Sequence, residues 1–418
     1  MKEEFLHYIF ESQKLSNSEF EIISSGQQNL DAGPDFFNAK IKIDNMVWVG
    51  NVEIHLRSSD WYKHSHHKDK AYDNIILHLV AIDDKVIYST EGKLIPTYEM
   101  KYDKRIYESY EKLLSNNSWI HCDNEIKEID QITKLSYIES LAIERLQRKS
   151  NRFEELLEFN NNHWEETFYQ AISEGFGSKV NSIPFELLSK NTPLTILQKH
   201  RDNLFQIEAI LFGQAGFLNS ALPEDEYYAL LQKEYNYLKN KYHLEAIRTE
   251  LWKFSKVRPS NFPSVKIALL AQLIQSHQSI LSKILDCKTL SDLNKLLDVS
   301  ASSYWETHYK FGKISHKRKK RLGKISKQHL IINTIVPFLY LYSRKTLKTH
   351  IKERCLEWLE DLEEETNNIT NRWINRGFEN NNAMQSQGLI ELKNEKCNKH
   401  KCIDCRIGHK ILTLAWND

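Results

Sequence analysis

The fold is decided by residues 33–78, which read GPDFFNAKIKIDNMVWVGNVEIHLRSSDWYKHSHHKDKAYDNIILH. Polar and apolar residues alternate in 35–43 and again in 47–56, and alternation with a period of two is typical of half-buried β-strands. Because successive strand side chains point to opposite faces, Glu53 and His55 should share one face. We expect the two strands to pair as a hairpin. That hairpin brings three polar side chains toward one edge: Asp35, Glu53 and His55.

A dense polar cluster follows the hairpin and leads into a third predicted strand, 74–82. Five of the chain's 17 histidines fall within residues 55–78. Carboxylate oxygens hold hard cations such as Mg²⁺ or Mn²⁺, and imidazole nitrogens suit Zn²⁺ or Mn²⁺. We therefore expect a divalent metal, Mg²⁺ or Mn²⁺, at this site. Its candidate ligands are Asp35, Glu53, Asp69 and His78, and its candidate catalytic residues are Asp35, Glu53, His55, His64 and His66.

Metal-assisted hydrolysis of a phosphodiester is the reaction that this cluster suggests. Asp35 and Glu53 would hold the ion, which lowers the pKa of a bound water. His55 would accept the proton of that water, and His64 or His66 would protonate the leaving oxygen or bind a second metal. The alternative is a structural one, in which the histidines are solvated surface or core residues and the carboxylates belong to a turn and an exposed strand.

The order of these residues resembles the PD-(D/E)XK nuclease superfamily. Pro34-Asp35 is followed, after 17 residues, by Glu53-Ile54-His55, so that His55 stands where the superfamily carries a lysine. The resemblance implies a core of one helix and three strands, in which an acidic residue of the helix, the Asp and the Glu hold one or two metal ions. The amino-terminal segment MKEEFLHYIFESQKL, predicted as a helix, offers three candidates for the first acid: Glu3, Glu4 and Glu11.

Further motifs extend along nearly the whole chain. They are GPDFFNAKI, W-x-GNVEIH, SSDW, H-x-H and AYDN-x-ILH, followed by FGSKVNSIPF, RPSNFP, NAMQSQGLIELKNEKC and CIDCRIG. Together they resemble a bacterial family catalogued as domain of unknown function 2851. The resemblance implies no particular activity, so the function must be argued from the residues.

Length and periodicity predict a two-part protein of the α+β class. At 418 residues the chain exceeds what one core usually serves, and 41% hydrophobic residues suffice for sizeable cores. The predicted helix and strands, with a short hairpin at 86–100, form a nuclease-like α/β domain over 1–120. In 121–418 apolar residues recur at helical spacing, which predicts a large all-helical domain. Its expected helices are 129–159, 163–177, 194–213, 223–254, 264–285, 289–297, 326–343, 346–367 and 383–396.

Charge and hydropathy favour a cytoplasmic protein. Lysine plus arginine (57) nearly balances aspartate plus glutamate (56), so no overall basic bias indicates nucleic acid. No apolar run approaches the roughly 18 to 20 residues that span a bilayer. The start, MKEEFLHYIF, lacks the apolar region of a signal peptide.

Three cysteines gather near the carboxyl terminus, in KCNKHKCIDCRIGHK. Cys397, Cys402 and Cys405 follow the spacing C-x4-C-x2-C, which in a cytoplasmic protein indicates metal rather than disulfides. Zn²⁺ with His409 as the fourth ligand is one interpretation, and an iron–sulfur cluster is the other. Three free thiols are the alternative to both. The iron–sulfur interpretation needs a fourth cysteine elsewhere in the chain: Cys122 or Cys355.

A basic run, HKRKKRLGKISK at 316–327, follows a group of aromatic residues. Basic side chains beside aromatic rings are typical of surfaces that contact nucleic acid, whereas a solvated helix face is the simpler alternative. The residues predicted to contact phosphates are Lys317, Arg318, Lys319, Lys320 and Arg321.

We therefore expect a metal-dependent nuclease that acts on DNA or RNA. Two alternatives stay open: a catalytically inactive nucleic-acid-binding or scaffold protein of the same fold, and a metal hydrolase that acts on a small phosphoester. The intact pair of Asp35 and Glu53 favours catalysis. His55 in place of the lysine, together with the nearly neutral charge, favours the inactive alternative.

Overall fold

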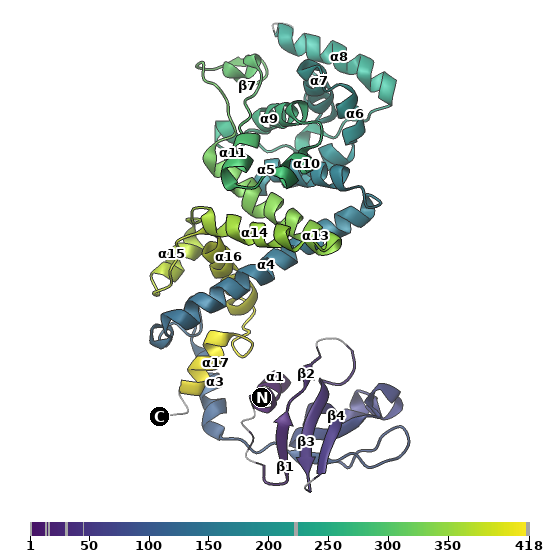
Figure 1. Cartoon of the computed structure of the whole chain (residues 1–418), viewed down its shortest axis with the longest axis vertical. Coiled ribbons are helices and arrows are strands. Elements are labelled where there is room, and N and C mark those ends of the chain that lie inside the picture. The colour runs from purple at the N-terminus through teal and green to yellow at the C-terminus, as the bar shows by residue number, and fades with distance from the viewer. Residues whose placement is uncertain are drawn as a thin grey trace. The chain divides into compact units, whose positions relative to one another are not determined.

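The computed structural model describes residues 2–12, 15, 17–29, 32–44, 46–220 and 225–414. The chain divides into two compact units, drawn in Figure 1. Unit 1 comprises 1–137, 376–378 and 392–418, and unit 2 comprises 138–375 and 379–391. The predicted α+β class is confirmed, because unit 1 holds a mixed sheet and unit 2 is almost wholly helical. Unit 1 also takes in 121–137, 376–378 and 392–418, which the sequence placed in the helical domain.

The sheet of unit 1 is built around the two alternating segments of the sequence. β3 (Phe36–Ile43) pairs antiparallel with β4 (Met46–Arg57), so the predicted hairpin is confirmed. β5 (Ile75–Ile82) lies parallel to β4, with Glu53 opposite His78. The strand order is β1-β3-β4-β5-β6, and β2 pairs with β3. The remaining strands are β1 (Phe20–Ser24), β2 (Gln27–Gln28) and β6 (Thr97–Glu99).

Helix α1 (Glu3–Glu11) covers one face of this sheet. The ring of Phe10 lies 4.9 Å from that of Phe36, and the strand partner of Phe36 is Val52. Directly paired residues point to the same face, so α1 packs on the face of Val52. The polar residues at odd positions of β4 therefore point to the other face.

The connection from β4 to β5 covers that other face, where Glu53, His55 and His78 point. Trp61 of this connection is fully buried, and its ring lies 5.6 Å from that of His78. Parallel strands require such a crossover, so the chain itself carries residues 58–74 across the polar face. The crossover contains three short helices: α2 (Asp60–Lys63), η1 (His66–Lys68) and η2 (Lys70–Tyr72).

The predicted hairpin at 86–100 is reduced to a single bridge between Tyr88 and Leu94 and to β6, which pairs with β5. Ile87 and Ile95 are buried in a small core with residues of the crossover, so they pack against it instead of extending the sheet. Unit 1 also contains α3 (Lys104–Ser115), η3 (Ile126–Glu128), η8 (Leu392–Cys397) and α17 (Arg406–Leu414).

Unit 2 packs its helices around one large hydrophobic core. Two predicted helices are interrupted by new caps: Asn203 accepts a hydrogen bond from Phe205 N within 194–213, and Ser279 caps in the same way within 264–285. Residues 1, 13, 14, 223 and 224, which the sequence placed in helices, lie outside the described residues. No helix in the described part of the chain is long and apolar enough to cross a membrane.

The helices of unit 2 follow α4 (Gln131–Phe159), which begins in unit 1. They are α5 (Trp164–Lys190), α6 (Leu194–Lys199), α7 (Leu204–Gln214), α8 (Glu226–Tyr242), η4 (Thr249–Leu251), η5 (Pro259–Asn261), α9 (Pro263–Ser276), α10 (Ile280–Asp286), α11 (Leu290–Leu296), η6 (Ser303–Glu306), α12 (Lys324–Leu330), η7 (Ile331–Ile335), α13 (Val336–Thr346), α14 (Thr349–Asp361), α15 (Asn368–Ile374) and α16 (Ala383–Glu391). A small hairpin of β7 (His308–Lys310) and β8 (Lys313–Ile314) was not predicted.

Candidate metal centre

Asp35 and Glu53 hold each other in place at the junction of β3 and β4. The backbone N–H of Asp35 donates to Glu53 Oε2 at 3.1 Å, and the N–H of Ile54 donates to Asp35 Oδ2 at 2.9 Å. Because each carboxylate accepts a hydrogen bond from the backbone of the other strand, both are fixed by the register of the hairpin. The sequence prediction that the hairpin brings these two acids together is confirmed.

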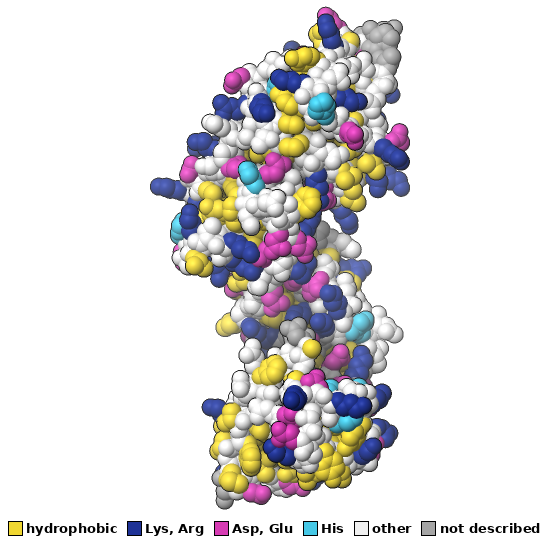
Figure 2. Space-filling view, turned by 90° about the vertical axis from the view of Figure 1, so that its right-hand side faces the viewer, with side chains coloured by type: hydrophobic (Ala, Val, Ile, Leu, Met, Phe, Trp, Pro, Cys, Tyr) yellow, Lys and Arg dark blue, Asp and Glu magenta, His cyan; other side chains and the backbone are white. Residues whose placement is uncertain are grey.

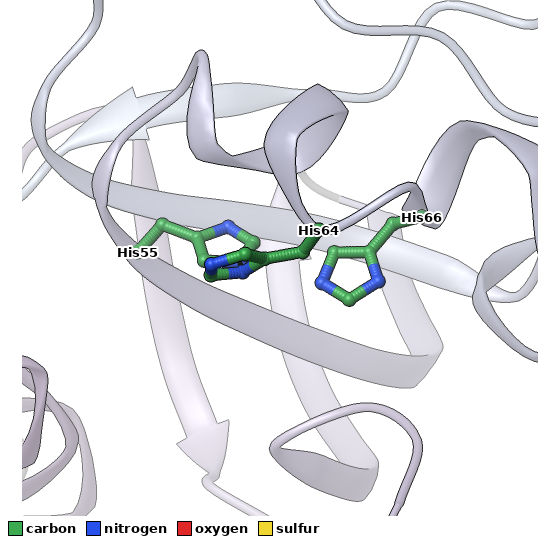
Figure 3. Close-up of side chains that lie close together, drawn as sticks. All are labelled: His55, His64 and His66. Carbon is green, nitrogen blue, oxygen red and sulfur yellow. Dashed lines mark hydrogen bonds between the residues drawn. The ribbon is translucent and has the colours of Figure 1, made fainter.

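Three imidazoles converge beside Glu53. His55 comes from β4, and His64 and His66 come from the crossover, as Figure 3 shows. One ring nitrogen from each histidine lies within 4.8 Å of the others. His55 Nε2 lies 3.2 Å from His64 Nδ1 and 3.5 Å from Glu53 Oε1. His66 Nε2 lies 3.4 Å from the same carboxyl oxygen.

These separations suit the ligands of one small divalent ion. A tetrahedron of ligands about 2.0–2.1 Å from a central Zn²⁺ has edges of about 3.3–3.4 Å. With Glu53 Oε1 counted as one of the ligand atoms, the three edges, 3.2, 3.5 and 3.4 Å, cluster around that length. The two contacts with Glu53 are longer than the 2.7–3.2 Å of good N–H···O hydrogen bonds, so hydrogen bonding alone does not explain why the groups converge. The donor set fits a metal.

A chain of hydrogen bonds fixes the tautomer of His55. Thr97 Oγ1 donates to the carbonyl oxygen of Ile95 at 3.2 Å, so it accepts from His78 Nδ1, which lies 3.3 Å away. His78 Nε2 is then left as an acceptor for His55 Nδ1, at 2.8 Å. His55 therefore carries its proton on Nδ1, and its Nε2 presents a lone pair to the convergence point.

Burial keeps three imidazoles of this region neutral. It lowers the pKa of His55 and of His78 to about 3, and that of His66 to about 4, with further repulsion from neighbouring histidines. Burial also raises the pKa of Glu53 to about 9, with added repulsion from the charges of Asp35 and Glu3. Neutral imidazoles are the form that binds metal, and a cation would draw the proton from Glu53.

Asp35 forms a second histidine–acid pair with a residue of α1. His7 Nε2 lies 3.4 Å from Asp35 Oδ2. Burial alone would lower the pKa of His7, but the Asp35 carboxylate, with Glu3 and Glu4, raises it above its usual value. Glu3, one turn before His7 on α1, accepts from Leu56 N at 3.3 Å. The sequence analysis missed His7, although its spacing of four residues from Glu3 places both on one helix face.

The other predicted ligands lie outside the convergence point. Asp69 is exposed, and its Oδ1 accepts from Ala71 N at the start of η2. His78 Nε2 contacts Nδ1 of His55, the nitrogen that faces away from the convergence point. His78 Nδ1 in turn contacts the hydroxyl of Thr97, a residue that the sequence analysis also missed. The predicted residues that the fold brings together are Asp35, Glu53, His55, His64 and His66.

The carboxyl-terminal cysteines lie in unit 1. Cys397, Cys402 and Cys405 line one cavity together with Cys122. His409, predicted as a zinc ligand, has its ring 5.1 Å from that of Tyr8. The other candidate for the fourth cysteine, Cys355, lies in the core of unit 2, where its thiol contacts the carbonyl oxygen of Val336.

The basic run of unit 2 is only partly exposed. Lys320 is buried, and its Nζ donates to the carbonyl oxygen of Glu306 at 2.7 Å, which removes it from the predicted nucleic-acid surface. Lys317 lies 3.7 Å from the Glu306 carboxylate. On the face shown in Figure 2, basic and acidic side chains are interspersed. The predicted residues that are exposed are Lys317, Arg318, Lys319 and Arg321.

Comparison with known proteins places the chain in a family. The family described as "Protein of unknown function (DUF2851)" matches residues 3–368, and the chain belongs to it, as its motifs predicted. The matched range includes the histidine centre and Cys122 and ends before the three carboxyl-terminal cysteines. No curated protein and no solved structure matches the chain.

Proposed function

We propose that this member of the DUF2851 family is a metal-dependent hydrolase that cleaves phosphodiester bonds in nucleic acid. The observation that carries the proposal is the convergence of His55, His64 and His66 on one point beside two carboxylates. Imidazole-rich sites suit Zn²⁺, whereas Mg²⁺ prefers all-oxygen sites. We therefore propose Zn²⁺ at this centre instead of the Mg²⁺ or Mn²⁺ expected from the acids alone.

The chain's own residues can supply the acid and the base of the reaction. The three histidines would hold the ion with Glu53 beside them, and a bound Zn²⁺ would supply a water of lowered pKa, about 7, and would polarise a phosphoryl oxygen. Glu53 Oε1 lies within 3.5 Å of two ligand nitrogens, so as a carboxylate it can accept the water's proton. His7, whose pKa the neighbouring Asp35 carboxylate raises, is the candidate to protonate the leaving oxygen.

Two features support nucleic acid as the substrate. The succession of α1, β1, β3 and β4, with Glu3, Asp35 and Glu53 near one another, agrees with the core that the PD-(D/E)XK resemblance implies. In unit 2, the exposed basic residues of 316–327 offer contacts to phosphates. DNA and RNA are both compatible with these features.

A structural metal site is the second candidate, and the position of Glu53 favours it. Glu53 is buried, and one of its oxygens approaches both His55 and His66. If that oxygen bound the metal, the shell would be closed by four protein ligands, as in structural zinc sites. The protein would then be an inactive relative of a hydrolase.

Hydrolysis of bis(p-nitrophenyl) phosphate and of labelled DNA and RNA oligonucleotides by zinc-loaded protein separates the two candidates. We expect activity that His55→Ala abolishes. Glu53→Gln should keep the zinc and lose about 10²–10⁴-fold in rate, as expected for a general base. His350→Ala, which changes an exposed histidine of α14, is the matched control and should leave the rate unchanged. An inactive wild type whose zinc is lost in Glu53→Gln would establish the structural site.

A further inference from the structure

We infer that Cys122, Cys397, Cys402 and Cys405 together hold a [4Fe–4S] cluster, with Cys122 as the fourth ligand. The four thiols line a common cavity of about 20 Å³ in unit 1. This inference is independent of the histidine centre and of the proposed hydrolysis.

Three separate pieces of backbone bring the thiols together. Cys122 lies in the turn before η3, where its carbonyl oxygen accepts from Ile126 N at 3.0 Å. Cys397 ends η8, and Cys405 immediately precedes α17. A Cβ at Gly408 would overlap the carbonyl oxygen of Cys402, so only glycine allows α17 to approach the Cys402 loop this closely. The backbone of this region therefore holds α17 and the Cys402 loop close together beside the cavity.

Hydrogen-bond donors and a cation lie beside one of the four sulfurs. All six cysteines are unpaired by disulfides, so these four thiols remain available to a metal. Backbone N–H groups at the start of α17 donate to the sulfur of Cys405, and Lys396 lies nearby. Such donors and cations stabilise a negatively charged metal–thiolate centre.

The spacing of the sulfurs favours a cluster over a single zinc ion. Four sulfurs about 2.3 Å from one Zn²⁺ lie about 3.8 Å from one another. Among the described residues, the ligand atoms of His55, His64 and His66 all lie within 4.8 Å of one another. No three of the four sulfurs lie that close together. A cube of iron and sulfide between the thiolates holds them further apart and needs no histidine ligand.

The inference is tested on full-length protein purified without oxygen and chelators. We expect a brown protein with about four iron atoms and four acid-labile sulfides per chain. In native wild type, an alkylating reagent should spare Cys122, Cys397, Cys402 and Cys405, and mass spectrometry should find all four modified after the cluster is destroyed by oxidant and chelator. This second measurement needs no variant and therefore does not depend on how a variant folds.

Substitution identifies the fourth ligand. Cys122→Ser should lose most of the iron. Cys287→Ser is the matched control, because Cys287 donates to the carbonyl oxygen of Lys283 and a serine hydroxyl can do the same, so its iron content should be unchanged. Colourless wild type with one zinc per chain, or four thiols that alkylate freely in the native protein, would overturn the cluster. Full iron content in folded Cys122→Ser would overturn the assignment of Cys122.

Discussion

His55 Nδ1 lies 2.8 Å from His78 Nε2, so a fully buried histidine of β5 stands behind the central ligand of the proposed metal centre. Metal-binding histidines usually donate their second ring N–H to a carboxylate, a carbonyl or water. Here the acceptor is another imidazole, whose own N–H is directed to Thr97. The orientation of His55 therefore depends on His78 and Thr97, which lie outside the proposed metal centre.

Replacement of His78 should weaken metal binding without removing a ligand. His78→Leu has no acceptor for His55 Nδ1, so zinc affinity should fall about 10–100-fold, the usual effect of losing such a partner. His78→Gln retains a side-chain oxygen that can accept from His55 and should recover most of the affinity. Competition with a chelating dye measures both constants. Equal affinities for the leucine and glutamine variants would contradict the role of the hydrogen bond.

Metal affinity should rise with pH between neutrality and about pH 9. Burial and the charges of Asp35 and Glu3 raise the pKa of Glu53 to about 9, so in this range the metal-free centre holds a proton on that carboxyl group. A cation binds beside the carboxylate and expels that proton, so the association constant should increase up to about tenfold per pH unit. The increase should level off above pH 9, where Glu53 is already ionised.

His55 and His66 do not contribute in this window, because their pKa values, about 3 and 4, lie far below it. Calorimetric titration in two buffers of different ionisation enthalpy should report about one proton released per ion at neutral pH. Glu53→Gln should reduce that release to the part given up by the water on the zinc ion. Unchanged proton release in this variant would place the proton elsewhere.

A stability prediction concerns Gly388 of α16. A Cβ at this position would overlap the carbonyl oxygen of Ile138 in α4, and a backbone atom cannot turn aside as a flexible side chain can. Gly388→Ala should therefore lower the free energy of unfolding of unit 2 by about 1–3 kcal/mol or more. Gly323→Ala, where an added Cβ meets nothing within 4 Å, should cost under about 1 kcal/mol in urea unfolding. Equal losses of unfolding free energy in the two variants would show that α16 and α4 move apart without cost.

The hairpin and its polar residues could be predicted from the sequence because their signals are local. Alternation fixes which residues of β4 share a face, and the crossover that a parallel strand requires places His64 and His66 over Glu53 and His55. Which of the candidate ligands lie at the convergence point could not be predicted. Asp69, unlike His66, is exposed, and its oxygen caps a helical turn, which becomes visible once the backbone is known.

Other features depend on contacts that leave no local trace. Ile87 and Ile95 look like strand residues, but they are buried against Trp61 in the small core under the crossover. Cys122 joins cysteines near the other end of the chain because η8 and α17 return to unit 1. The spacing C-x4-C-x2-C indicated a metal, but it could not choose Cys122 over Cys355.

The most direct test of the histidine centre is the zinc content of full-length protein after equilibrium dialysis, compared with that of His55→Ala/His64→Ala. The wild type and the double variant both retain the cysteines, so any metal bound by the cysteines is common to the two samples. The account predicts one zinc ion fewer per chain in the double variant, with the secondary structure of unit 1 preserved by circular dichroism. Equal zinc content in the folded double variant would show that the convergence of His55, His64 and His66 is not a metal site.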